Sequence, residues 1–180
     1  MQPRIPRQPD HDQAGGRPDD DARLTAELAA VISAARRRAV RDADRHVDTA
    51  HLLHSLLEYD PEVRSVFDDG PQIARLLGYL VQRSIGYGLR WQGSVEDSGA
   101  VPLVTADGLS PLAAGALEYA CARAAGRGDE PARGVDLLAA IVVDREARAV
   151  EVLARAGIDA GEVYARIDSR PERHAWEGGY

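Results

Sequence analysis

Apolar residues in the N-terminal half of the chain fall in adjacent pairs, Leu52-Leu53 and Leu56-Leu57, that lie one helical turn apart. This spacing gives a helix an apolar face too wide to be left in water, so it predicts a strongly buried helix over residues 49–59. Asp48 or Thr49 can accept hydrogen bonds from the first free amides of that helix. The pattern therefore predicts one short, buried helix with a polar start.

The same pattern occurs a second time, shifted by 85 residues from Leu52 to Leu137, where Leu137-Leu138 and Ile141-Val142 form the pairs. Leu109-Ser110-Pro111 follows Leu24-Thr25-Ala26 at the same shift, and both triplets place a hydroxyl residue where a helix can begin. Two matches at one shift indicate an internal duplication, in which two small units share one core. We therefore expect both halves of the chain to carry the same set of helices.

The remaining apolar positions predict four helices in each half. The expected helices cover residues 24–39, 49–59, 62–69, 73–80, 111–124, 135–144, 146–156 and 158–167. We thus predict an all-α fold of two tandem four-helix repeats, residues 23–85 and 109–168, packed with pseudo-twofold symmetry. The other segments are polar or rich in glycine, so we interpret them as a disordered arm, a linker and a polar tail, over residues 1–22, 86–108 and 169–180.

Composition narrows the possible partners. Hydrophobic residues make up 44% of the 180 residues but aromatic residues only 5%, so the core must be built from Ala, Leu and Val, which favours packed helices. The net charge of −7 makes the protein a poor general binder of nucleic acid or of anionic membranes. The single cysteine, Cys121, cannot form an internal disulfide, and we expect a cytoplasmic protein without a signal peptide or a transmembrane segment.

Four stretches carry a resemblance to a known family. They are Leu24-Thr25, Leu109-Ser110, Val47-Asp48-Thr49-Ala50-His51-Leu52-Leu53 and Ala156-Gly157-Ile158-Asp159. Together with the duplication, they resemble the N-terminal double-repeat domain of Clp unfoldases, closest to the ClpC type. The two pairs are similar to the hydrophobic-Thr helix openings of that family, the long stretch to its hydrophobic-x-Thr-Glu-His-Leu-Leu signature, and the last to its hydrophobic-Gly-Ile-Asp turn. The resemblance covers residues 24–168.

The resemblance implies a module that binds peptides or proteins in grooves between its helices. Such a module would be an adaptor, or a decoy that sequesters Clp-targeting cyclic peptide antibiotics, and its partners would be a ClpC-type unfoldase, the substrates of that unfoldase or those peptides. The implied ligand-binding residues are Leu24, Thr25, Leu109, Ser110, His51 and Asp136. The signature glutamate, which is implicated in binding phosphoarginine in that family, is replaced by Ala50 and Val135, and this replacement disfavours phosphoarginine as a ligand without deciding it.

The sequence does not favour an enzyme. The chain contains no lysine, so it cannot hold the Gly-x-x-x-x-Gly-Lys-[Ser/Thr] phosphate loop of the ATP-hydrolysing Clp modules, and we expect neither unfoldase activity of its own nor a cofactor. His51 and His54 lie one turn apart on the predicted helix 49–59, and a metal-dependent hydrolase built on this pair is the alternative. An interaction domain unrelated to Clp is a second alternative.

Arginines are concentrated in the first predicted helix and just after it. Arg37, Arg41 and Arg45 are spaced by four residues and share one face. This face is either a solvated surface paired with nearby acidic residues, or a docking patch for an acidic partner.

Overall fold

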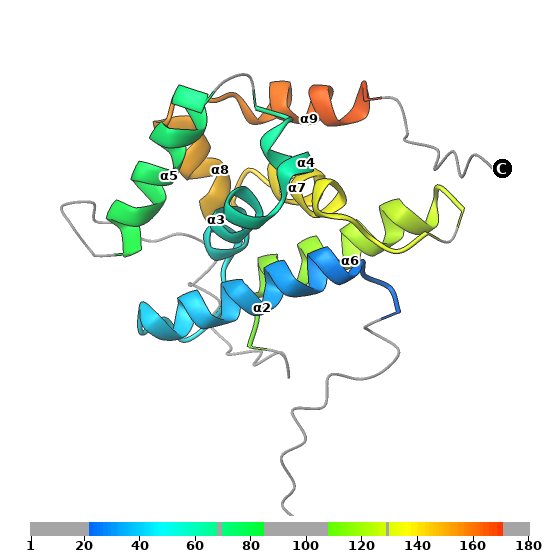
Figure 1. Ribbon diagram of the computed structural model, residues 1–180, viewed down its shortest axis with the longest axis horizontal. Helices are drawn as coiled ribbons and strands as arrows, with labels where there is room; N and C mark the ends of the chain where they lie inside the picture. The colour runs from blue at the N-terminus through cyan, green and yellow to red at the C-terminus, as the bar shows by residue number, and fades with distance from the viewer. Residues whose placement is uncertain (1–21, 68–69, 85–107, 129, 171–180) are drawn as a thin grey trace, which may run out of the picture.

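The computed structural model describes residues 22–67, 70–84, 108–128 and 130–170 (Figure 1). These residues form eight helices and no strand, which confirms the predicted all-α class. The helices are α2 (Ala26–Arg41), α3 (Thr49–Tyr59), α4 (Pro61–Arg64), α5 (Gly70–Ser84), α6 (Pro111–Ala125), α7 (Gly134–Val143), α8 (Arg148–Arg155) and α9 (Ala160–Asp168). Almost all of the predicted arm, linker and tail lies outside the described residues. Within them, no helix has the length and apolar character needed to cross a bilayer.

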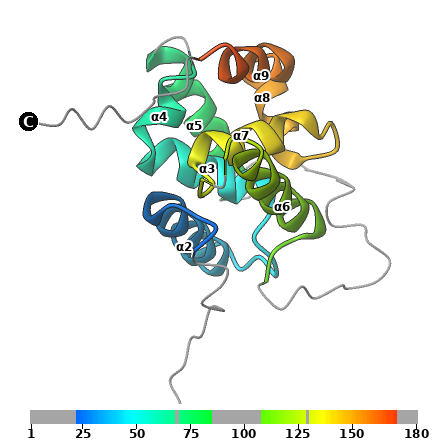
Figure 2. The same cartoon turned by 90° about the vertical axis from the view of Figure 1, so that its right-hand side faces the viewer.

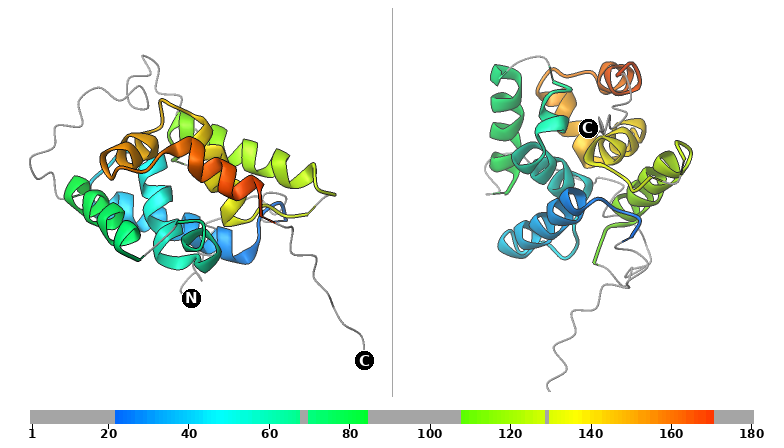
Figure 3. Two further views of the ribbon diagram at one scale, coloured as in Figure 1. Left: turned by 90° about the horizontal axis from the view of Figure 1, so that it is seen from above. Right: turned by 45° about the vertical axis from the view of Figure 1, so that its right-hand side comes forward.

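Helices α3 and α7 form the middle layer of the molecule. In Figures 1 and 2 they lie between α2 and α6 on one side and α5, α8 and α9 on the other. The right-hand view of Figure 3 gives the same order, with α2 (blue) below and α5 (green) and α9 (red) above. Every residue of Thr49–Leu57 in α3 and of Gly134–Val142 in α7 is buried. The paired apolar pattern arises because each of these helices is covered on all sides.

The helix starts follow from side-chain caps. The Oγ1 atom of Thr25 accepts the Leu28 amide at 3.2 Å before α2, and the Oγ atom of Ser110 accepts the Ala113 amide at 3.1 Å before α6. Asp48 caps α3 by accepting the His51 amide at 2.9 Å. Each cap supplies an acceptor to a first-turn amide that has no partner within its own helix. The predicted starts of these three helices are confirmed to within two residues.

The prediction of a helix over residues 62–69 was wrong in length. Helix α4 is a single turn. It ends there because the amides of Val66 and Phe67 donate to carbonyls three residues back, at 3.0 and 3.1 Å, which is the pattern of a tighter turn and not of an α-helix. Val66 and Phe67 are nevertheless buried in the core. Helix α5 begins at Gly70, three residues before the predicted start at residue 73.

One continuous apolar core connects all eight helices. Helix α2 packs on α3, and α6 packs on α7. Contacts also run between the N-terminal and C-terminal halves of the chain: α3 packs on α8, and α4 packs on α7. Phe67 is the aromatic residue among the buried members of this core, which is otherwise built from Ala, Leu, Val, Ile and Cys121. The aliphatic core expected from the composition is confirmed.

Two isolated parallel bridges tie the segments that precede the helices. Leu24 pairs with Ala132, where the Thr25 amide donates to the Ala132 carbonyl at 3.0 Å and the Ala132 amide donates to the Arg23 carbonyl at 2.8 Å. Val47 pairs with Leu109 in the same way, and both of its hydrogen bonds are 2.8 Å long. The start of α2 is thereby fixed beside the start of α7, and the start of α3 beside that of α6.

Candidate functional site

A groove of about 280 Å³ opens between α6, the C-terminal end of α7 and the turn into α8. It is lined by small, apolar and a few polar residues: Thr49, Pro111, Leu112, Gly115, Ala116, Tyr119, Ala140, Ile141, Val143, Asp144 and Ala147. Glycine and alanine at the contact between α6 and α7 leave the space that larger side chains would fill. The groove therefore follows directly from the alanine-rich composition of these helices.

Two of the lining side chains are large, apolar and exposed. Tyr119 is 41% exposed and Val143 is 45% exposed, whereas most apolar side chains of their helices are buried. A hydrogen bond with Tyr164 and burial raise the pKa of Tyr119 above its ordinary value, so its hydroxyl stays protonated in neutral solution. Asp144 is the acidic residue of the lining. The groove thus combines an apolar floor with one carboxylate, which suits a ligand with an apolar side chain next to a donor or a cation.

The predicted hydroxyl ligands are already engaged as helix caps. Thr25 is half-buried, and Ser110 is buried with an exposed fraction of 1%. Leu109 is buried too, and Leu24 is half-buried in its bridge with Ala132. These four predicted ligand-binding residues therefore lie at the two bridges, and none of the six predicted residues lines the groove.

Asp136 lies at the start of α7 and is fully buried. Its carboxylate accepts the Arg133 amide at 2.9 Å and pairs with Arg127, whose Nη2 atom lies 2.6 Å from Oδ2. The Nε atom of Arg123 lies 3.4 Å from Oδ1. Two guanidiniums and one amide satisfy this carboxylate, since a buried charge without partners would be costly. The contacts of Asp136 are thus those of a structural residue.

Asp48 and His51 stand at the start of α3. The Oδ2 atom of Asp48 pairs with Arg83 of α5 and, at 2.9 Å, with Arg148 of α8. Burial alone would raise the pKa of this carboxyl, but the hydrogen bond with His51 and the Arg83 guanidinium hold the pKa far below its usual range. The neighbouring Thr49 Oγ1 accepts the Ala149 amide at 3.2 Å. This polar contact attaches the start of α8 to the start of α3.

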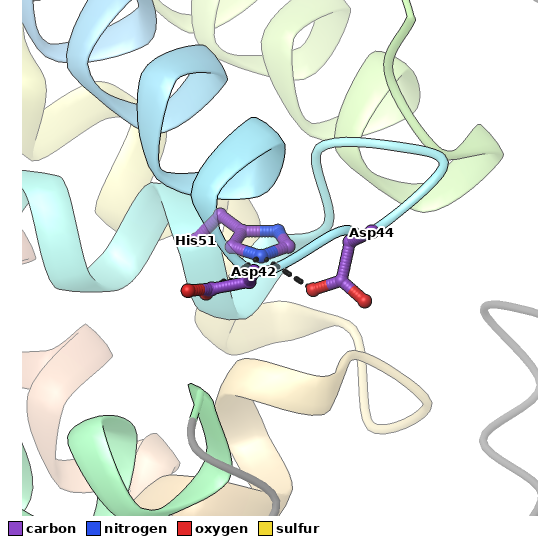
Figure 4. Close-up of side chains that lie close together, drawn as sticks. All are labelled: Asp42, Asp44 and His51. Atoms are coloured by element: carbon purple, nitrogen blue, oxygen red, sulfur yellow. Dashed lines mark ion pairs between the residues drawn. The ribbon is translucent and has the colours of Figure 1, made fainter.

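The ring of His51 is buried, with an exposed fraction of 1%. Its Nδ1 atom accepts the Asp48 amide at 3.0 Å, which completes a reciprocal cap. Its Nε2 atom faces Asp44 at 2.9 Å and Asp42 at 3.6 Å (Figure 4). In the part of the chain that the structure describes, these three residues are the group that could hold a metal ion.

His54 does not belong to this group, so the alternative in which His51 and His54 bind a metal together has no cluster to support it among the described residues. The Nε2 atom of His54 lies 3.2 Å from Glu58 Oε1. Burial, together with the nearby Arg38 guanidinium, lowers the pKa of His54 from 6.5 to about 4. The ring is therefore neutral at physiological pH and bonded within its own helix.

Arg37, Arg41 and Arg45 are exposed, and none of them forms an ion pair with another described residue. The nearby acids face other partners: Asp44 contacts His51, and Asp48 contacts Arg83 and Arg148. The predicted pairing of these arginines with acidic neighbours is thus absent from the described part of the chain. The docking patch for an acidic partner stays a prediction.

Comparisons with known proteins support the fold alone. No protein-family model matches the chain, and no curated protein matches it. A solved structure from preliminary structural investigations of a malarial protein secretion system has a similar fold, with a TM-score of 0.58. The sequence identity is 14%, and the match covers 81% of this chain and 92% of the other. This helical arrangement therefore exists in a solved structure of very different sequence.

Proposed function

We propose that the chain is a non-catalytic module that binds peptides or proteins, related to the N-terminal domains of ClpC-type unfoldases. It acts as an adaptor or as a decoy in ClpC-dependent proteolysis, and cyclic peptides that target such domains are candidate ligands. The observation that carries the proposal is the groove between α6 and α7, with exposed Tyr119 and Val143 at its surface.

The two bridges support the duplication on which the resemblance rests. At the shift of 85 residues, Leu109 is the equivalent of Leu24, and Ala132 is the equivalent of Val47. The Leu24–Ala132 bridge therefore has an equivalent in the Leu109–Val47 bridge. In the second bridge each residue is replaced by its equivalent in the other half of the chain. The hydrogen bonds follow the same rule, since Thr25 to Ala132 becomes Ser110 to Val47. An exchange of this kind is expected when two copies of one unit pack about a twofold axis.

Helix packing supports the same interpretation. Helices α2 and α6 start 85 residues apart, as do α3 and α7. The contact of α3 with α8 has its counterpart in the contact of α7 with α4, with the halves exchanged. The later helices differ in length, because α4 has 4 residues and α8 has 8. We propose a pseudo-twofold pair of repeats, in which α2 corresponds to α6 and α3 corresponds to α7.

The size of the groove favours a peptide side chain as its occupant. About 280 Å³ lies at the lower limit of small-molecule pockets, roughly 300–1,000 Å³. Burying one large apolar side chain contributes about 1.5–3 kcal/mol, whereas a micromolar complex needs about 8 kcal/mol. A ligand must therefore anchor one side chain in the groove and extend over the surface around it, as a peptide does.

Gly115 offers a direct test, because it lies in the groove and its added Cβ would meet no atom within 4 Å. Gly115→Leu should fill the groove without disturbing the fold. Gly78→Leu in α5 is the matched control, since Gly78 is also helical, exposed and surrounded by open space. Calorimetry with Clp-targeting cyclic peptides, and pull-down with a ClpC-type unfoldase, should give binding that Gly115→Leu abolishes and Gly78→Leu retains.

Binding that is equal in both variants would contradict the assignment of the groove. Failure of both assays with the unmodified protein would remove the relation to ClpC. An unbiased pull-down that recovers a partner outside the Clp system, lost again in Gly115→Leu, would then favour an interaction domain of another pathway.

A further inference from the structure

The end of α2 and the start of α3 bring three potential metal ligands together. Asp42 is the C-cap of α2, Asp44 follows in the loop, and His51 lies in the first turn of α3. One ligand atom from each lies within 4.8 Å of the other two. Figure 4 shows both carboxylates on the Nε2 side of the His51 ring. Two carboxylates and one imidazole form a mixed oxygen and nitrogen donor set.

The Nε2 atom of His51 is the second observation. It is buried and makes no hydrogen bond to any residue that the structure describes. Asp44 Oδ2 lies 2.9 Å from it, as an ion pair that needs a positive charge on the ring. Buried polar atoms almost always have a partner. A buried ring nitrogen that makes no hydrogen bond and faces two carboxylates indicates that a cation binds at this position.

Asp48 supplies the outer support that metal-bound histidines commonly have. The Nδ1 atom of His51 lies 3.0 Å from both the amide nitrogen and the Oδ1 atom of Asp48. If Nδ1 accepts the amide proton, the ring proton sits on Nε2. If Nδ1 instead carries the proton and donates it to Oδ1, the lone pair of Nε2 is free to bind a cation, which is the tautomer that a carboxylate–histidine–metal arrangement uses.

We propose that Asp42, Asp44 and His51 form a binding site for a divalent transition-metal ion, with Zn²⁺ as the best fit. In a tetrahedral zinc site neighbouring ligand atoms are about 3.4 Å apart. The distances from Nε2, 2.9 and 3.6 Å, lie on either side of this value. Asp44 is exposed, so its side chain can adjust and the fourth position is open to water.

The types of ligand atom also determine which metal ion the site prefers. Imidazole nitrogen is a good ligand for zinc and a poor one for Mg²⁺ or Ca²⁺, which prefer oxygen ligands only. The bound ion would join the end of α2 to the first turn of α3, so that binding should stabilise the folded protein against heat. This site is separate from the groove, and its test does not depend on peptide binding.

Isothermal titration of the untagged full chain with ZnCl₂, after treatment with a chelator, tests the proposal. We expect one ion per chain, a higher Tm with Zn²⁺, and no comparable effect of Mg²⁺. Asp42→Asn, Asp44→Asn and His51→Gln should each weaken binding at least about tenfold. His51→Gln keeps an oxygen that can accept the Asp48 amide, so the cap of α3 survives.

His46→Gln is the matched control, because His46 lies in the same loop but outside the ligand group. It should leave zinc binding unchanged. In ¹H–¹⁵N spectra, zinc should move the His51 ring proton from Nε2 to Nδ1. No saturable binding at millimolar Zn²⁺, or binding equally strong in all four variants, would overturn the proposal. If His51→Gln does not fold, as far-UV circular dichroism would show, the two aspartate variants decide.

Discussion

Gly134 opens α7 at the point where α4 crosses it, and it tolerates no side chain. An ideal Cβ at this position would overlap Oδ2 of Asp60 and lie 3.0 Å from its Cγ atom and 3.1 Å from Cδ2 of Leu56. Asp60 cannot move freely, because its Oδ1 atom caps α4 by accepting the amides of Glu62 and Val63 at 2.9 and 3.2 Å. Gly134→Ala should therefore displace the Asp60 carboxylate and break this cap.

The expected loss follows from two costs and one gain. Overpacking a filled site costs about 1–3 kcal/mol, and losing an N-cap costs about 1 kcal/mol. Alanine has a helix propensity up to about 1 kcal/mol better than glycine, which offsets part of the loss. We expect a net decrease of about 2 kcal/mol in the free energy of unfolding, and a Tm lower by about 4–8 °C.

Urea denaturation followed by far-UV circular dichroism measures this loss. Gly78→Ala is the control, since its new methyl group meets open space and should stabilise α5 slightly. In an Asp60→Ala background the clash disappears, so Gly134→Ala should cost little there and the double-mutant cycle should give a coupling of at least about 1 kcal/mol. A Gly134→Ala protein as stable as the unmodified one, or additive effects in the cycle, would refute this account.

Three further changes have defined outcomes. Ala43 has a left-handed backbone with φ of 56°, so Ala43→Gly should raise the free energy of unfolding in urea by about 0.5–1 kcal/mol; a decrease would contradict the assigned strain. Gly157 closes α8 with φ of 76°, and Gly157→Ala should lower the same quantity by a similar amount. Burial beside Arg38 lowers the pKa of His54 from 6.5 to about 4, so the folded state resists its protonation. The free energy of unfolding should therefore keep its full value above pH 6.5 and fall by up to about 3 kcal/mol as the pH drops toward 4. His54→Gln should make the free energy of unfolding less dependent on pH in this range.

The sequence predicted best the elements that are buried on every side. The pairs Leu52-Leu53 and Leu56-Leu57 gave the bounds of α3 correctly, because a helix surrounded by others must be apolar around most of its circumference. Ser110 gave the start of α6, since the capping hydroxyl and Pro111 are local signals. Helix α4 was overestimated because its apolar spacing continues through Phe67 after its hydrogen bonds have changed. Burial shapes the pattern of apolar residues, but it does not fix where a helix ends.

Neither the groove nor the group formed by Asp42, Asp44 and His51 could be predicted from the apolar pattern. The groove forms where segments far apart in the chain meet, and its floor is made of alanine and glycine, which carry no chemical signal. Tyr119 and Val143 offered a weak one, since each is an apolar residue away from the buried face of its helix. Asp42 and Asp44 lie between the predicted helices 24–39 and 49–59, where the apolar pattern predicts no structure. Only the turn at Ala43 brings both carboxylates to the His51 ring.

The two bridges decide how much of the chain can exist as a folded piece. A fragment ending at Ser84 would lose the partners of the Thr25 and Val47 amides, since both carbonyls that accept them belong to residues beyond position 107. It would also lose the Ala132 amide, which donates to the Arg23 carbonyl, and the Ser110 amide, which donates to the Val47 carbonyl. Helices α7 and α8, which pack on α3, would be missing too. Even if each half descends from one ancestral unit, neither is now an autonomous folding domain, and melting should be a single cooperative event for the whole polypeptide.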